Sequence, residues 1–91
     1  MNAARRYLVS GLVQGVGFRY WALTRARERG VVGFVRNLPD GKVEIVAEGA
    51  DESLDALRED LTVGPSYSKV SHVEESLVVP TGRYSTFSID R

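Results

Sequence analysis

The chain of 91 residues contains no cysteine, a single histidine and no excess of either charge. Without cysteine it can form neither disulfides nor thiolate metal sites. Its twelve basic and twelve acidic residues give a formal charge of zero, so no broad electrostatic field would attract nucleic acid or an anionic membrane. An anionic ligand would therefore have to be bound locally, by a few well-placed groups.

Long apolar runs are also absent from the sequence. Nowhere do about eighteen apolar residues follow one another, as a membrane-spanning helix needs, and the first residues lack the apolar segment of a signal peptide. We therefore expect a cytoplasmic protein that does not bind membranes.

The length favours a single domain over residues 1–91, because domains commonly have about 100–150 residues. A monomer is the expected state.

The segment 9–19, which reads VSGLVQGVGFR, passes from a strand-like alternation through two glycines into a helical pattern. Gly15 and Gly17 can adopt backbone conformations that let amide N–H groups point inward, and Arg19 opens a helix whose first N–H groups lack intrahelical partners. The planar guanidinium of arginine suits bidentate contact with a phosphate or carboxylate. The segment predicts a small-anion site formed by Gln14, Gly15, Val16, Gly17, Phe18 and Arg19.

Two common phosphate-binding motifs do not fit this segment. The dinucleotide fingerprint needs a third glycine where Tyr20 stands, and the Walker loop needs Gly-Lys-Ser/Thr where the chain has Gly17-Phe18-Arg19. Neither NAD nor ATP is predicted. From composition alone, a plain strand-to-helix turn with a surface arginine remains an alternative interpretation.

The hydrophobic periodicity predicts an α+β protein with the ferredoxin-like split βαβ arrangement (βαββαβ), an antiparallel sheet with two helices on one face. A right-handed crossover makes the first two strands parallel, with the third strand between them. The expected strands cover residues 7–13, 31–37, 42–47 and 69–75, with a short final strand around 87–89, and the expected helices cover 18–29 and 51–63.

The expected topology brings the two polar motifs together. The glycine loop leaves the carboxyl end of the first strand, and Asn37 stands at the carboxyl end of the second, about 10 Å away. Arg19 and Asn37 should therefore face one ligand. The Asn37 amide offers both an acceptor and donors, which suits holding a water molecule at a fixed angle. An arginine, amide donors and a held water include no acid that could protonate a leaving group, so this site suits a substrate whose leaving group needs none at neutral pH.

Two stretches of the sequence resemble the signatures of the acylphosphatase family. The first is segment 9–19 itself, and the second is segment 33–43, GFVRNLPDGKV, followed by Gly49. The resemblance implies a small, free-standing acylphosphatase that hydrolyses acyl phosphates without a cofactor or a metal ion. It assigns phosphate binding to Arg19 and orientation of the attacking water to Asn37. Inorganic phosphate would be both product and inhibitor.

Several other residues receive expectations from the same patterns. Gln14 is expected mainly to bind nearby backbone groups, with substrate contact as the less favoured role. Arg36 should point to the opposite face of the sheet from Asn37. His72 is not expected to be catalytic. Glu44 and Glu48 are expected to be exposed.

Two positions depart from the family pattern. Leu12 stands where many relatives carry a polar or basic side chain, and the segment 66–69, Ser-Tyr-Ser-Lys, is bulkier than the small-residue segment usual there. Leu12 bears on the polarity of the site and its affinity for substrate, and the 66–69 segment bears on where the fourth strand begins.

A rival interpretation is a non-catalytic module of the same fold that binds a phosphate or a nucleotide backbone. A sheet that reads RNA carries stacking aromatic residues and a basic surface, and the sequence shows neither pattern. A further alternative is an acylphosphatase-like domain that acts in a carbamoyl-phosphate pathway or as a partner module. The sequence does not name the natural acyl phosphate.

Overall fold

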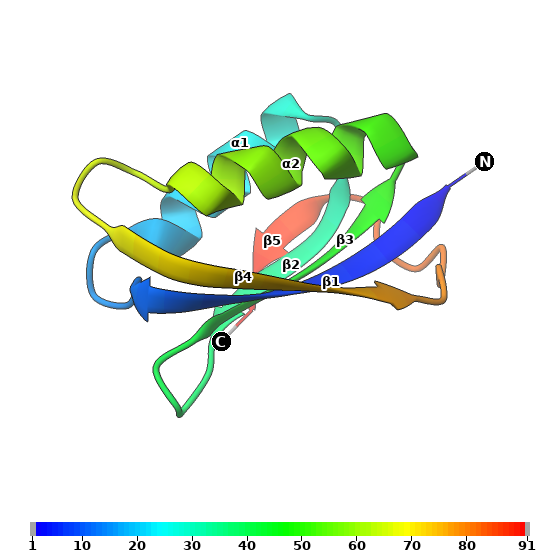
Figure 1. The fold of residues 1–91 in the computed structure, drawn as a ribbon. Helices are drawn as coiled ribbons and strands as arrows, with labels where there is room; N and C mark the ends of the chain where they lie inside the picture. Colours follow the sequence, from blue (N-terminus) through cyan, green and yellow to red (C-terminus); the bar gives the residue numbers. More distant parts are fainter. Residues whose placement is uncertain (1, 91) are drawn as a thin grey trace.

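The computed structural model of the protein describes residues 2–90, which form one five-stranded sheet with two helices on one of its faces (Figure 1). This arrangement confirms the predicted ferredoxin-like α+β fold. The strand order in the sheet is β4-β1-β3-β2-β5. Along the chain the elements are β1 (Ala3–Leu12), α1 (Phe18–Glu28), β2 (Val32–Asn37), β3 (Val43–Gly49), α2 (Asp51–Val63), β4 (Lys69–Val78) and β5 (Phe87–Ile89).

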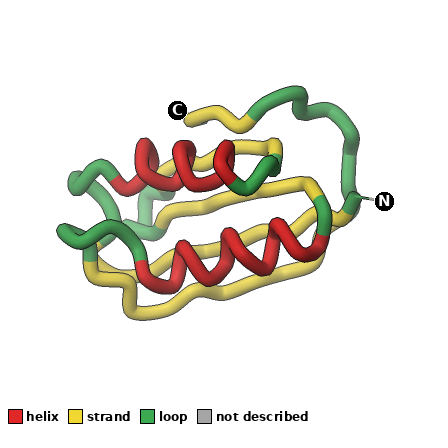
Figure 2. Tube along the Cα trace, turned by 90° about the horizontal axis from the view of Figure 1, so that it is seen from above, coloured by secondary structure: helices red, strands yellow, loops and turns green. Residues whose placement is uncertain are grey.

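The sheet is mixed, so the prediction of a wholly antiparallel sheet is wrong at one edge. β5 pairs in parallel with β2, with Gly33 opposite Phe87, while the other neighbouring strands are antiparallel. The connection 79–86 leaves β4 and re-enters the sheet at the same end, along the right of Figure 2. β5 therefore runs opposite to β4 and in the same direction as β2.

The core lies between the helices and the sheet and follows the predicted periodicities. Phe18, Ala22 and Ala26 of α1 are buried, and α2 contributes Leu54, Leu57 and Leu61. They pack against β-strand residues of the same face, which are Tyr7, Val9, Val35, Val43, Ile45, Ala47 and Phe87. Trp21 is partly buried, with its ring centroid 5.3 Å from that of Phe18.

Two signature glycines are required by close backbone contacts. A Cβ on Gly11 would lie 2.1 Å from the carbonyl oxygen of Lys69, and one on Gly33 would lie 1.9 Å from that of Val46. Both residues also have positive φ angles, of 124° and 140°. Gly11 stands where the register between β1 and β4 shifts, as in a β-bulge. These positions keep β1 and β2 close to their neighbours.

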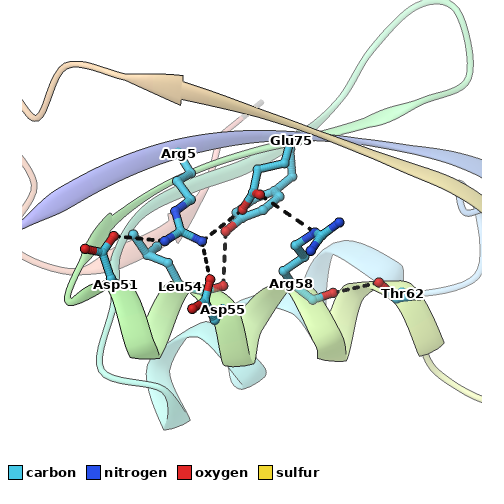
Figure 3. A network of polar contacts seen from close by, with 8 residues as sticks. Arg5, Asp51, Leu54, Asp55, Arg58, Thr62 and Glu75 are labelled. Carbon is cyan, nitrogen blue, oxygen red and sulfur yellow. Dashed lines mark hydrogen bonds and ion pairs between the residues drawn. The ribbon is translucent and has the colours of Figure 1, made fainter.

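A network of ion pairs joins α2 to the sheet (Figure 3). The mostly buried guanidinium of Arg5 contacts Asp51 at 2.9 Å, Asp55 at 2.6 Å and Glu75 at 3.0 Å. Hydrogen bonding, to Asp55 above all, raises the pKa of Arg5 despite its burial, so it stays charged. Beside this network the buried Tyr7 hydroxyl donates to the carbonyl oxygen of Leu54. The network fixes α2 over β1 and β4.

Glu44 and Glu48 are buried, so the expectation that they would be exposed is wrong. Both lie on the central strand β3, where neighbouring residues cover them. Glu44 is held by the guanidinium groups of Arg6 and Arg36 from the flanking strands. Burial would raise the pKa of Glu44, but these hydrogen bonds outweigh it and lower the pKa. Alternation along a strand gives the face of a side chain and not what covers it.

Glu48 fastens the 79–86 connection to the sheet. Its carboxylate accepts the backbone N–H and the hydroxyl of Thr81, both at 2.9 Å, and the N–H of Gly82 at 3.0 Å. Burial would raise the pKa of Glu48, but these hydrogen bonds lower it below its ordinary value of 4.5. The charged form is therefore favoured in the folded state.

No helix among residues 2–90 has the length and apolar character to cross a membrane.

We predict that Glu48→Gln destabilises the fold by about 1–3 kcal/mol at pH 7, because the backbone donors lose a charged acceptor. A folded-state pKa below the ordinary value means that this stabilisation is present above that value and is lost as the pH falls. The difference in free energy of unfolding between wild type and variant should therefore shrink from pH 7 to pH 3. Urea denaturation measures both values, with Glu74→Gln on exposed β4 as control. An equal difference at both pH values contradicts the assignment.

Candidate active site

The β1–α1 loop, the end of β2 and the end of β5 surround a pocket of about 160 Å³. The volume suits an anion of phosphate size together with water. The β1–α1 loop and the β2–β3 turn lie at the left of Figure 1, at the end of the sheet opposite the 79–86 connection. Eight residues line the pocket: Val13, Gly15, Gly17, Phe18, Arg19, Tyr20, Asn37 and Ile89.

The loop backbone leads directly into the amino end of α1. Gly15 and Gly17 have φ angles of 74° and 75°, the left-handed region that glycine adopts at little cost. Gly17 is the N-cap residue, no side chain caps the helix, and its first turn contains no acidic residue. The first helical hydrogen bond runs from Trp21 N–H to the Gly17 carbonyl. The N–H groups before Trp21 therefore have no intrahelical acceptor and favour an anion.

Arg19 lines the pocket and is half-buried. Within residues 2–90 its guanidinium has no hydrogen bond or ion pair. Most other arginines differ, because Arg5, Arg6, Arg25, Arg29, Arg36 and Arg58 each pair with a carboxylate, and Arg27 donates to the carbonyl oxygen of Phe87. The positive charge of Arg19 is thus left for a ligand.

Asn37 lines the same pocket from the end of β2. Its side-chain oxygen is buried and has no hydrogen-bond partner in the described part of the chain. A buried amide group without a partner costs about 1–3 kcal/mol, so such groups are expected where water or a ligand completes the bonding. Arg36, the preceding residue, pairs with Glu44 instead, which confirms that it points to the opposite face.

Gln14 ties the loop to the β2–β3 turn. Its side-chain amide donates to the carbonyl oxygens of Leu38 at 2.8 Å and Lys42 at 2.9 Å. The predicted contact with nearby backbone is therefore confirmed. These bonds hold the loop beside the turn that follows Asn37, so they fix the separation between the two halves of the pocket.

Local hydrogen bonds stabilise the β2–β3 turn. Asp40 accepts the backbone N–H of Lys42 at 3.0 Å, and Gly41 N–H donates to the carbonyl of Leu38.

Of the predicted loop residues, the structure brings four to the pocket wall, namely Gly15, Gly17, Phe18 and Arg19. Gln14 and Val16 do not line it. Sequence reasoning missed Val13, Tyr20 and Ile89. The position of Tyr20 next to Arg19 in the first helical turn was an available signal, whereas Ile89 reaches the pocket only because β5 pairs with β2.

His72 lies away from this pocket. It lines a separate groove between α2 and β4, together with Arg58 and Thr62. Among residues 2–90 no group of three or more His, Asp or Glu side chains is arranged to hold a metal ion.

Comparisons with known proteins agree with the two motifs. The family model for acylphosphatase matches residues 5–89. An acylphosphatase of Bifidobacterium longum (strain NCC 2705) is 53% identical over 73 residues, which cover 79% of this chain and 75% of that protein.

Solved structures of acylphosphatases also resemble this protein. The crystal structure of acylphosphatase from Bacillus subtilis has a TM-score of 0.93 and 37% identity, over the full length of both chains. An acylphosphatase from Coxiella burnetii has a TM-score of 0.91 and 39% identity, over 98% of this chain and 93% of that one. The match over residues 5–89 and the identity over most of the chain show that this protein belongs to the acylphosphatase family.

Proposed function

We propose that the pocket is the active site at which this acylphosphatase hydrolyses acyl phosphates to a carboxylate and inorganic phosphate. One observation carries the proposal. An arginine without a carboxylate partner, Arg19, and an amide oxygen without a hydrogen-bond partner, on Asn37, line the same small pocket at the amino end of a helix.

Arg19 and the loop backbone hold the phosphate in this proposal. The guanidinium donates two parallel hydrogen bonds to phosphoryl oxygens, and amide N–H groups of the loop 14–19 supply further donors at the positive end of α1. Gln14 and Val16 contribute through their backbone, since the Gln14 side chain is already bound to the turn. Local binding of this kind suits a chain with no net charge.

Asn37 positions the attacking water. Its side chain does not take up a proton at neutral pH, so its role is to hold the water in line with the bond between phosphorus and the leaving oxygen. As the water oxygen bonds to phosphorus, the electron pair of the broken bond leaves on the carboxylate. The protons of the water stay with the phosphate, which is released as its monoanion.

The reaction needs no leaving-group acid, because the carboxylic acid has a pKa of about 4 and its carboxylate is stable at neutral pH. Arginine and helix N–H groups stabilise the charge of the transition state, which is the work of a divalent cation in many phosphoryl transferases. We therefore propose that hydrolysis requires neither metal nor cofactor. The product phosphate would inhibit the enzyme by occupying the same pocket.

We propose that the chain forms a single domain and acts as a monomer. We also propose a cytoplasmic location, which suits a chain without cysteine and hence without disulfides.

We predict rapid hydrolysis of benzoyl phosphate that a chelator does not reduce, with negligible hydrolysis of p-nitrophenyl phosphate. The pocket supplies charge stabilisation and a held water but no acid for the more basic phenolate leaving group. Initial rates on both substrates, with and without chelator, measure this. Equal activity on the two substrates, loss of activity with chelator, or binding of phosphate without any hydrolysis contradicts the proposed function.

We predict that Arg19→Ala and Asn37→Ala separate binding from catalysis. Phosphate at about a hundred times its dissociation constant should stabilise wild type by about 2.7 kcal/mol, a melting shift of several degrees. Arg19→Ala should abolish the shift. Asn37→Ala should keep it while turnover falls about 100-fold or more. Arg19→Lys should also lose most turnover, since an ammonium lacks the planar bidentate fork.

The matched control is Arg83→Ala, which removes an exposed arginine from the 79–86 connection at the other end of the sheet. It should leave both the shift and the turnover at wild-type values. If Asn37→Ala loses the phosphate shift, or if Arg19→Lys retains full turnover, the corresponding role is wrong.

A further inference from the structure

Two exposed tyrosines stand at the rim of the phosphate pocket. Tyr20 lines the pocket, and 69% of its surface is exposed. Tyr67 is 60% exposed, and its ring Cε2 and hydroxyl oxygen lie 3.8 Å and 3.7 Å from the position that a Cβ would occupy on Gly17. Gly17 is itself part of the pocket wall. Tyr67 therefore borders the loop that we assign to phosphate binding.

The fold fixes the position of Tyr67. The α2–β4 connection contains a turn in which both the N–H and the hydroxyl of Ser68 donate to the Pro65 carbonyl, at 3.0 Å and 2.8 Å. β4 begins at Lys69, whose partner across the sheet is Leu12, the last residue of β1. The α2–β4 connection and the β1–α1 loop consequently lie at the same end of the molecule, at the left of Figures 1 and 2.

The rim differs in character from the base of the pocket. Arg19, Asn37 and the loop amides are polar, whereas the rim presents the two aromatic rings of Tyr20 and Tyr67. A substrate whose phosphate is held at the base places its acyl group toward this rim. Covering exposed aromatic surface with an apolar group is favourable, and ring pairs gain further from offset or edge-to-face contact.

We propose that Tyr20 and Tyr67 form an acyl-binding subsite, so that this enzyme favours acyl phosphates with aromatic or extended apolar acyl groups over those with small ones. This inference rests on the proposed function, since it requires the phosphate to occupy the pocket beside Arg19. To that function it adds the class of acyl group that the enzyme prefers. Tyr20 contributes from the first turn of α1, and Tyr67 contributes from the α2–β4 connection.

The test compares benzoyl phosphate with acetyl phosphate, which have the same phosphate and similar carboxylate leaving groups but differ in the acyl side. The ratio of their kcat/KM values should fall by about 3- to 10-fold in Tyr20→Ala and in Tyr67→Ala, mainly through a higher KM for benzoyl phosphate. Tyr67→Phe keeps the ring and should keep the ratio. Leu77→Ala removes an apolar side chain that is 82% exposed, far along β4, and should leave the ratio unchanged.

The ratio separates substrate contact from a structural role. A tyrosine that merely supports the loop would, when removed, slow both substrates equally and leave the ratio at the wild-type value, and that result in both variants overturns the subsite. If Tyr67→Ala does not fold, Tyr20→Ala decides the question by the same ratio. A wild type that hydrolyses neither substrate refutes the proposed function itself, whereas hydrolysis with a ratio independent of both tyrosines refutes only the acyl-binding subsite.

Discussion

The pairing of β3 between β1 and β2 is the constraint on which the site depends. Val43 of β3 lies opposite Val9 on one side and opposite Asn37 on the other, so the three residues stand in one row across the sheet. The loop that follows β1 and the end of β2 are therefore held about two strand spacings apart, near 10 Å. Two hydrogen bonds from Gln14 to the β2–β3 turn then fix the loop at that separation.

Most of the described arginines are held by a partner, whereas the arginine in the pocket is not. The chain has no net charge, and arginines such as Arg5 and Arg27 are bound by carboxylates or by a backbone carbonyl. Arg19 is the arginine that lines the pocket, beside the uncapped amino end of α1. A neutral protein can thus present a strongly positive site over a few ångströms, where an anion loses little attraction to screening.

The sequence predicted the elements that local pattern controls and missed features that depend on distant residues. The helix expected over residues 18–29 follows from a local pattern and was confirmed, with Phe18, Ala22 and Ala26 on its buried face. The parallel pairing of β5 depends on the path of the 79–86 connection. The burial of Glu48 depends on Thr81 and Gly82, more than thirty residues away. The catalytic roles of Arg19 and Asn37 stay predictions.

In the proposed mechanism water attacks phosphorus, because Arg19, the loop amides and Asn37 would surround the phosphate and not the acyl carbonyl. The same hydrolysis products would arise if water attacked the carbonyl carbon. Hydrolysis of benzoyl phosphate in ¹⁸O-labelled water, analysed by mass spectrometry, distinguishes the two paths directly. We predict the label in inorganic phosphate and none in benzoate, and label in benzoate would contradict attack at phosphorus.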